Sequence, residues 1–148
     1  MLACSVALAP PAFAAPAAPP ALKTTELGKG PTIVIVHALG GSRADWTAVA
    51  SKLAAHHHVV TVDLPGHGDS ALPDSFTFAA AGAALAQVLA AQPAGGSVVV
   101  GHQFGGRVAL AALAVHPELT RGLVLIDVPV ALPVKLADEQ KQAFLASL

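Results

Sequence analysis

Apolar residues along this chain form two alternating patterns, short β-branched runs and longer segments with helical spacing. Four of the runs are rich in Val and have few polar interruptions, which is typical of strands buried on both faces of a parallel sheet. We therefore predict strands over residues 32–36, 58–63, 97–100 and 122–127. A weaker pattern over 21–28 predicts a short edge strand.

Apolar residues at helical spacing fill the intervals between these strands. We predict helices over 42–55, from Asp74 or Ser75 to a stop at 92–96, and over 104–116, with a further helix over 138–148. The segment Ser42-Arg43-Ala44-Asp45 is a capping-box pattern that would start the first of them. The expected apolar faces are Trp46, Val49, Ala50 and Leu53; Phe78, Gly82, Leu85 and Leu89; and Phe104, Val108, Ala112 and Val115.

Strands that alternate with helices of this length predict an α/β fold. Right-handed crossovers would place helices on both faces of a mostly parallel, doubly wound sheet. The 148 residues suffice for one domain, and with 54% hydrophobic and 11% charged residues the chain is not of the disordered class. The net charge of -1 comes without a basic cluster, so we expect no nucleic-acid partner.

The first twenty residues have a separate composition, rich in Ala and Pro. Ala12-Phe13-Ala14 fits the A-x-A pattern of a signal-peptidase site, although no basic residues precede the apolar stretch. Residues 1–20 are therefore either the remnant of an export signal, which would make the protein periplasmic or secreted, or an Ala/Pro linker. No apolar run reaches the roughly 18 residues of a membrane span, and the lone Cys4 excludes an internal disulfide.

Three loops follow predicted strands, at the edge where open α/β sheets place their sites. They cover residues 37–42, 63–70 and 101–106. In the third loop, Gly101 and Gly105 flank position 103 symmetrically, which is typical of the sharp strand-to-helix turn called a nucleophile elbow. Such a turn forces its central residue into a sparsely populated backbone conformation at a helix N-terminus, where negative charge is favoured.

With these three loops in this order, residues 32–127 resemble the α/β-hydrolase superfamily. His37-Ala38-Leu39-Gly40-Gly41 is similar to the family's oxyanion loop, and 63–70 is similar to its structural D-x-x-G-x-G-x-S turn. The resemblance implies that 21–148 is the N-terminal part of such a domain. It also implies that the backbone N–H groups of Leu39 and Phe104 form the oxyanion hole, and it implies no cofactor.

The nucleophile position departs from the family pattern, because Gln103 stands where Ser, Asp or Cys is usual. A side-chain amide forms no usable nucleophile at neutral pH. The family's acid and histidine follow later in the chain, after strands that this sequence does not contain. Asp127, at the end of the last predicted strand, is a candidate acid, and the alternative is that it only bonds within the following turn.

Histidines are the remaining candidates for a base. His37 lies beside the expected pocket, where hydrogen bonding is a simpler role than general-base catalysis. We expect structural roles for His67 in its turn and His102 in the elbow, and a surface or capping role for His116 before a proline. The tract 56–58 has the composition of a metal site, but successive strand residues point to opposite faces, so we expect no metal there.

These observations leave three hypotheses open. The chain is derived from a serine-type hydrolase of esters or related acyl bonds and is inactive as written; it is a non-catalytic protein that binds a small acyl or ester ligand; or it is a truncated gene product without function. Gly40 is typical of esterase-like members, whereas Phe104 after the nucleophile position is common among Asp-nucleophile members. The last strand would form an exposed apolar edge, which predicts self-association.

Overall fold

The structure is a computed structural model, and it describes residues 19–128. Its elements in chain order are β1 (Lys23–Leu27), β2 (Thr32–Val36), the 3-10 turn η1 (Arg43–Trp46), α1 (Thr47–Leu53), β3 (His58–Asp63), α2 (Phe78–Ala90), β4 (Ser97–His102), α3 (Phe104–Val115), the 3-10 turn η2 (Pro117–Leu119) and β5 (Thr120–Ile126). The A-x-A sequence at 12–14 and the helix expected over 138–148 lie outside the described residues.

The strands form one sheet in the order β1-β3-β2-β4-β5. β2, β3, β4 and β5 run parallel, and the edge strand β1 pairs with β3 in the antiparallel direction. Val36 lies opposite Val62 on β3 and opposite Gly101 on β4, so three strands end side by side. The three loops singled out in the sequence therefore leave the sheet at the same edge.

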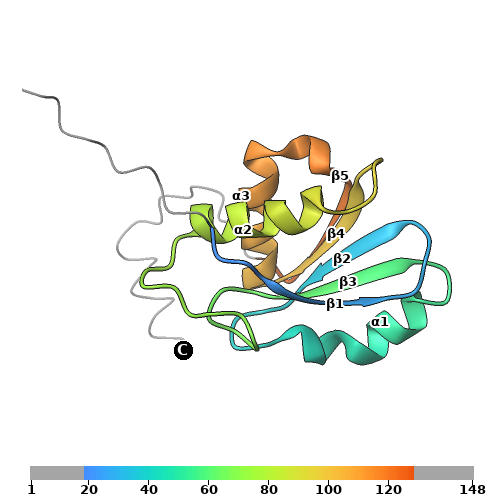
Figure 1. Ribbon diagram of the computed structural model, residues 1–148, viewed down its shortest axis with the longest axis horizontal. Helices are drawn as coiled ribbons and strands as arrows, with labels where there is room; N and C mark the ends of the chain where they lie inside the picture. Colours follow the sequence, from blue (N-terminus) through green and yellow to red (C-terminus); the bar gives the residue numbers. More distant parts are fainter. Residues whose placement is uncertain (1–18, 129–148) are drawn as a thin grey trace, which may run out of the picture.

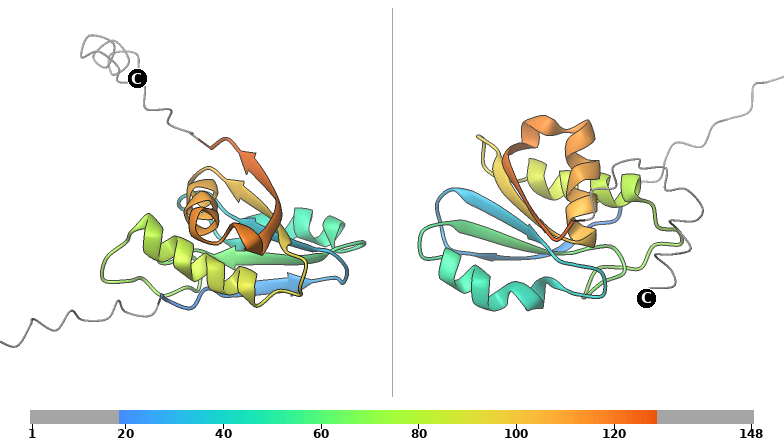
Figure 2. Two further views of the ribbon diagram at one scale, coloured as in Figure 1. Left: turned by 90° about the horizontal axis from the view of Figure 1, so that it is seen from above. Right: turned by 180° about the vertical axis from the view of Figure 1, so that it is seen from behind.

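Helices cover both faces of this sheet, as predicted (Figure 1). Seen from behind, α1 lies across the sheet from α2 and α3 (Figure 2). The larger core cluster packs Val34, Val60 and Val99 against Leu85 of α2 and Val108 of α3. On the opposite face of the sheet, buried strand residues pack with Ala50 of α1 and form a smaller cluster. The prediction of a doubly wound, mostly parallel α/β sheet is confirmed.

Several predicted element boundaries were wrong. The continuous helix over 42–55 is instead the turn η1 followed by α1, and the Ser42 capping box closes the turn: the Ser42 N–H donates to Asp45 Oδ2 at 2.9 Å. α2 begins after Thr77, whose Oγ1 accepts from the Ala80 N–H at 3.0 Å, and not at residues 74–75. β4 continues to His102, and β5 spans 120–126 because residue 127 turns to a positive φ.

Two residues assigned to apolar helix faces are exposed. Val49 of α1 is 44% exposed and Val115 at the end of α3 is 71% exposed. Helical spacing identifies which residues share one side of a helix, but α1 is only seven residues long. Its apolar side packs against the sheet through Ala50 and Leu53. Within residues 19–128, no helix combines the length and apolar character needed to cross a membrane.

Candidate active site

The turn between β4 and α3 has the geometry of a nucleophile elbow, with Gln103 at its apex. Gln103 has φ 46° and ψ -110°, outside the regions that residues with a side chain favour. Its N–H donates to Ile126 O at 2.9 Å, and its carbonyl accepts from the Gly106 N–H at 3.1 Å. The apex is thus fixed to the neighbouring strand on one side and to the first turn of α3 on the other.

Glycines around the apex are required by close backbone contacts. A Cβ on Gly101 would lie 2.5 Å from Gly106 Cα. A Cβ on Gly105 would contact the carbonyl oxygen of His37 and would lie 2.6 Å from that of Val36. Both distances are shorter than van der Waals contact, so the elbow packs directly against the end of β2 and the start of the loop that follows it.

The side chain of Gln103 is exposed and bonds to Asp127. Its Nε2 donates to Asp127 Oδ2 at 2.7 Å. The sequence named these two residues as the nucleophile position and the candidate acid, and the structure places them in direct contact. In this arrangement the Asp127 carboxylate holds the Gln103 amide and orients no histidine.

The loop after β2 carries the first oxyanion donor that the sequence suggested. A turn is closed by the Gly41 N–H, which donates to Ala38 O at 3.1 Å, and Gly40 takes a positive φ of 73°. Leu39 lies in this turn with 67% of its surface exposed. The second suggested donor, the N–H of Phe104, belongs to the first residue of α3 and so has no acceptor inside the helix. Both groups lie at the carboxyl edge of the adjacent strands β2 and β4.

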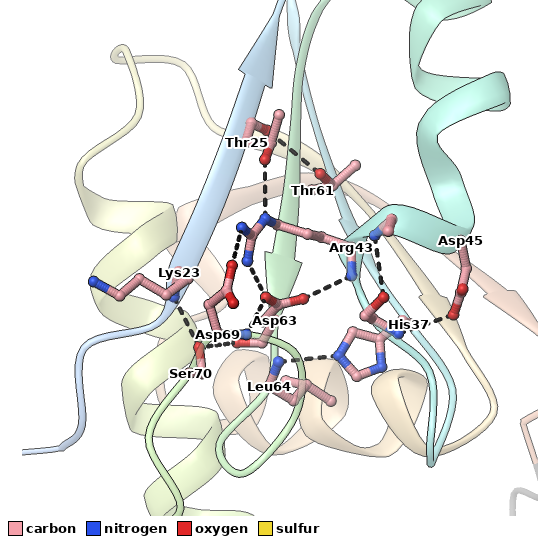
Figure 3. Close-up of polar contacts among 12 residues, drawn as sticks. Lys23, Thr25, His37, Arg43, Asp45, Thr61, Asp63, Leu64, Asp69 and Ser70 are labelled. Atoms are coloured by element: carbon pink, nitrogen blue, oxygen red, sulfur yellow. Dashed lines mark hydrogen bonds and ion pairs between the residues drawn. The ribbon is translucent and has the colours of Figure 1, made fainter.

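His37, the first residue of this loop, is 1% exposed and uses both ring nitrogens; Figure 3 shows its bond to Leu64. Nδ1 donates to Ala38 O at 2.7 Å, and Nε2 accepts from the Leu64 N–H at 3.0 Å. This pattern is that of a neutral imidazole. Burial lowers the pKa of His37 and outweighs the hydrogen bond to Ala38, which raises it. With neither nitrogen free, His37 holds the loop and has no lone pair to offer as a base.

The other end of the loop is held by Arg43 and the buried Asp63 (Figure 3). Asp63 accepts from the Arg43 N–H at 2.7 Å and from the Asp69 N–H at 2.9 Å, and its Oδ2 also pairs with the guanidinium of Arg43. Burial opposes ionisation of Asp63, but these two N–H groups and the Arg43 charge lower its pKa overall. Asp63 and Leu64 together therefore hold both ends of the candidate oxyanion loop.

Four further histidines have contacts of their own. His67 Nδ1 lies 3.0 Å from Pro65 O, and the His102 ring packs edge-on against Trp46 with the ring centroids 6.1 Å apart. His58 pairs with Glu26, and His116, at the C-terminal end of α3, pairs with Glu118. No group of three or more His, Cys, Asp or Glu side chains within residues 19–128 could hold a metal ion.

An open groove of about 510 Å³ lies beside the candidate oxyanion loop. Its lining includes the turn residues 38–41 together with Trp46, Val49, His102 and Ile126. Trp46 packs against the smaller core cluster, as predicted, and it lines the groove as well. The packed position predicted for Val49 was wrong, and the groove was not predicted. Helical spacing does not distinguish a residue in the core from one that lines a groove. The one signal for a groove was that both residues follow directly after the candidate oxyanion loop.

A family model described as alpha/beta hydrolase fold matches residues 31–147. Lipase LipV of Mycobacterium tuberculosis is 42% identical over 97 residues, which are 63% of this chain and 37% of that protein. The sn-1-specific diacylglycerol lipase ABHD11 of Xenopus laevis is 32% identical over 101 residues, 67% of this chain and 32% of that protein. The chain thus spans about a third of these curated relatives. A solved structure named marine microorganism esterase superposes with a TM-score of 0.72 at 24% identity, covering 87% of this chain and 52% of its own.

Proposed function

This chain belongs to the alpha/beta hydrolase fold family, and from that premise we propose that it binds an acyl ligand without hydrolysing it through a covalent intermediate. One observation carries the proposal: Gln103 occupies the apex of an otherwise intact elbow, and its amide is bonded to Asp127. The similarity to a lipase and a diacylglycerol lipase supports an acyl compound as the ligand class.

Covalent hydrolysis needs a nucleophile and a base at the apex. A carboxamide cannot form an acyl-enzyme ester. Its nitrogen lone pair is delocalised, and the amide N–H does not lose its proton at neutral pH. All seven histidines of the chain lie in the described part. His37, the first residue of the oxyanion loop, has both ring nitrogens engaged. His102 packs its ring edge-on against Trp46, and the Asp127 carboxylate bonds to the Gln103 amide rather than to a histidine.

Ligand binding requires less than catalysis does. The N–H groups of Leu39 and Phe104 are the candidate donors to a carbonyl or carboxylate oxygen, and the N-terminus of α3 favours negative charge there. The groove beside the loop offers Trp46, Val49 and Ile126 to an apolar chain. An acyl head at the elbow with its tail in the groove is the ligand geometry that we propose.

The test combines turnover with binding. We expect p-nitrophenyl butyrate hydrolysis at the rate of buffer alone for the chain as it stands, and a raised melting temperature with millimolar hexanoate. Gln103→Ser is the matched variant, and we expect no efficient turnover from it, because Asp127 orients no histidine toward the apex in this arrangement. Ester turnover with a burst phase in the unaltered chain would overturn the non-covalent proposal. Absence of any thermal shift of the unaltered chain with acyl compounds would overturn the binding proposal.

A further inference from the structure

The hydrogen bond between Gln103 and Asp127 fixes which way the amide of Gln103 faces. At neutral pH a carboxylate only accepts hydrogen bonds, whereas an amide offers NH2 on one side and oxygen on the other. The 2.7 Å contact therefore requires Nε2 toward Asp127, and the planar amide directs Oε1 away from Asp127. Because Gln103 is exposed, this oxygen is accessible to a ligand.

This orientation gives the elbow a defined pattern of donors and acceptors. The candidate oxyanion groups, the N–H of Leu39 and of Phe104, donate to a ligand oxygen. Gln103 Oε1 accepts a hydrogen bond, so the matching ligand carries a donor group next to its own carbonyl oxygen. A carboxamide presents a carbonyl oxygen and an N–H on one carbon. An ester presents a second oxygen in place of the N–H, which would face Oε1 without a hydrogen bond.

The groove lies on the same pair of strand ends. His102 and Ile126 line it, and they directly precede Gln103 and Asp127 in the sequence. Val49 and Ile126 expose 44% and 39% of their surfaces, and Leu39 exposes 67%. An unbranched aliphatic chain on the ligand carbonyl would cover these apolar surfaces.

We propose that this site selects aliphatic carboxamides over esters of the same acyl chain, with Gln103 as the residue that determines the specificity and Asp127 as the residue that positions it. This inference rests on the proposed acyl-binding function. It assigns to Gln103 a role that an apolar residue at the same position could not fill, since such a side chain would present no acceptor to the ligand.

The experiment compares binding of hexanamide and methyl hexanoate to the whole chain by titration calorimetry or ligand-observed NMR. We expect hexanamide to bind about tenfold more tightly, the ratio that corresponds to one net hydrogen bond of roughly 1.4 kcal/mol. In Gln103→Leu, which keeps both N–H groups but has no acceptor, the ratio falls to about one. In Asp127→Asn the side chain at 127 can both donate and accept, so the Gln103 amide can bond to it in either of two flipped orientations. We expect the affinity ratio to fall to a value between ten and one.

The control is Asp74→Asn, an exposed carboxylate of the loop before α2, which we expect to keep the tenfold ratio. Melting curves establish that each variant is folded, and the comparison on the unaltered chain needs no variant. Equal affinity for amide and ester would overturn the selectivity and leave acyl binding in place. Binding of neither compound would overturn both proposals, and a preference that survives in Gln103→Leu would overturn the role of Gln103.

Discussion

Gln103 donates to Asp127 across 2.7 Å, and within residues 19–128 these are the two residues other than glycine that have a positive φ, 46° and 49°. Asp tolerates left-handed backbone better than most residues. Gln103, with ψ at -110°, lies in a region that is costly for any side chain. The unfavourable conformation is thus retained at an elbow that has no nucleophile, held there by the glycine contacts on either side.

Strain at the apex predicts an unusual ranking of two substitutions. Both Gln103→Ala and Gln103→Gly remove the bond to Asp127, but only glycine relieves the backbone strain, which is worth about 1–3 kcal/mol. Part of that gain is lost to the greater freedom of glycine in the unfolded chain. We expect Gln103→Gly to be more stable than Gln103→Ala by about 1 kcal/mol in chemical denaturation. Equal stability of the two variants would show that the apex is not strained.

Close packing of the elbow predicts a second stability difference. Gly105→Ala places a methyl group against the His37 carbonyl, so the elbow or the loop must shift, and we expect a loss of about 2–3 kcal/mol. Gly122→Ala is the matched control, because its methyl group would find only Val98 Cγ2 at 3.7 Å. We expect that change to stay within about 0.5 kcal/mol. A Gly105→Ala variant as stable as the control would contradict the packing described here.

The sequence predicted well those features that are set by local chemistry. The β-branched runs gave the parallel strands, and two glycines around Gln103 gave the elbow, because each pattern has few alternative conformations. It failed where a tertiary contact decides. Val49 lines a groove, although its spacing suggests a core position. α2 starts only after Thr77, whose side chain caps it, and the neighbouring rings of Phe76 and Phe78 pack on one another and on the Phe104 ring.

Arg43 is the clearest site residue that sequence analysis missed. It was noted only as a position inside a capping box, yet its backbone N–H and guanidinium both bind the buried Asp63. The interaction joins residues 20 positions apart, and local periodicity contains no information on such pairs. One signal was present, an aspartate at the end of an otherwise apolar strand, because a buried carboxylate needs a partner of opposite charge.

Among residues 19–128, the outer edge of β5 has no paired strand, and this predicts association between copies of the chain. In the described part, β5 pairs with β4 alone, and it exposes Val124 and Ile126. We expect sedimentation velocity to show species that grow with concentration, and Val124→Lys to reduce them, because a charge on an edge strand disfavours pairing. Val115→Lys, an equally apolar exposed position on α3, is the control and should not. Monomers at all concentrations would contradict this expectation.

His37 predicts a stability change in mildly acidic solution. Its pKa in the folded chain lies below the ordinary value of 6.5 because the ring is buried. The unfolded state therefore binds a proton first as the pH falls, so the contribution of His37 is complete above about pH 6.5 and is lost as the pH drops toward the folded pKa. In that window the free energy of unfolding falls by up to about 1.4 kcal/mol per pH unit. Asp63, whose pKa is lowered from 3.8, acts in a separate window below that value.

His37→Gln separates this effect from general acid destabilisation. A glutamine oxygen can accept from the Leu64 N–H in place of Nε2 but does not titrate, so we expect lower stability at pH 8 and a flatter profile between pH 5 and 6.5. His56→Gln, on the loop before β3, is the matched control and should keep the original slope. The measurement is urea denaturation of the three proteins at half-unit pH intervals. If His37→Gln keeps the full slope, His37 is not the group that couples folding of the oxyanion loop to pH.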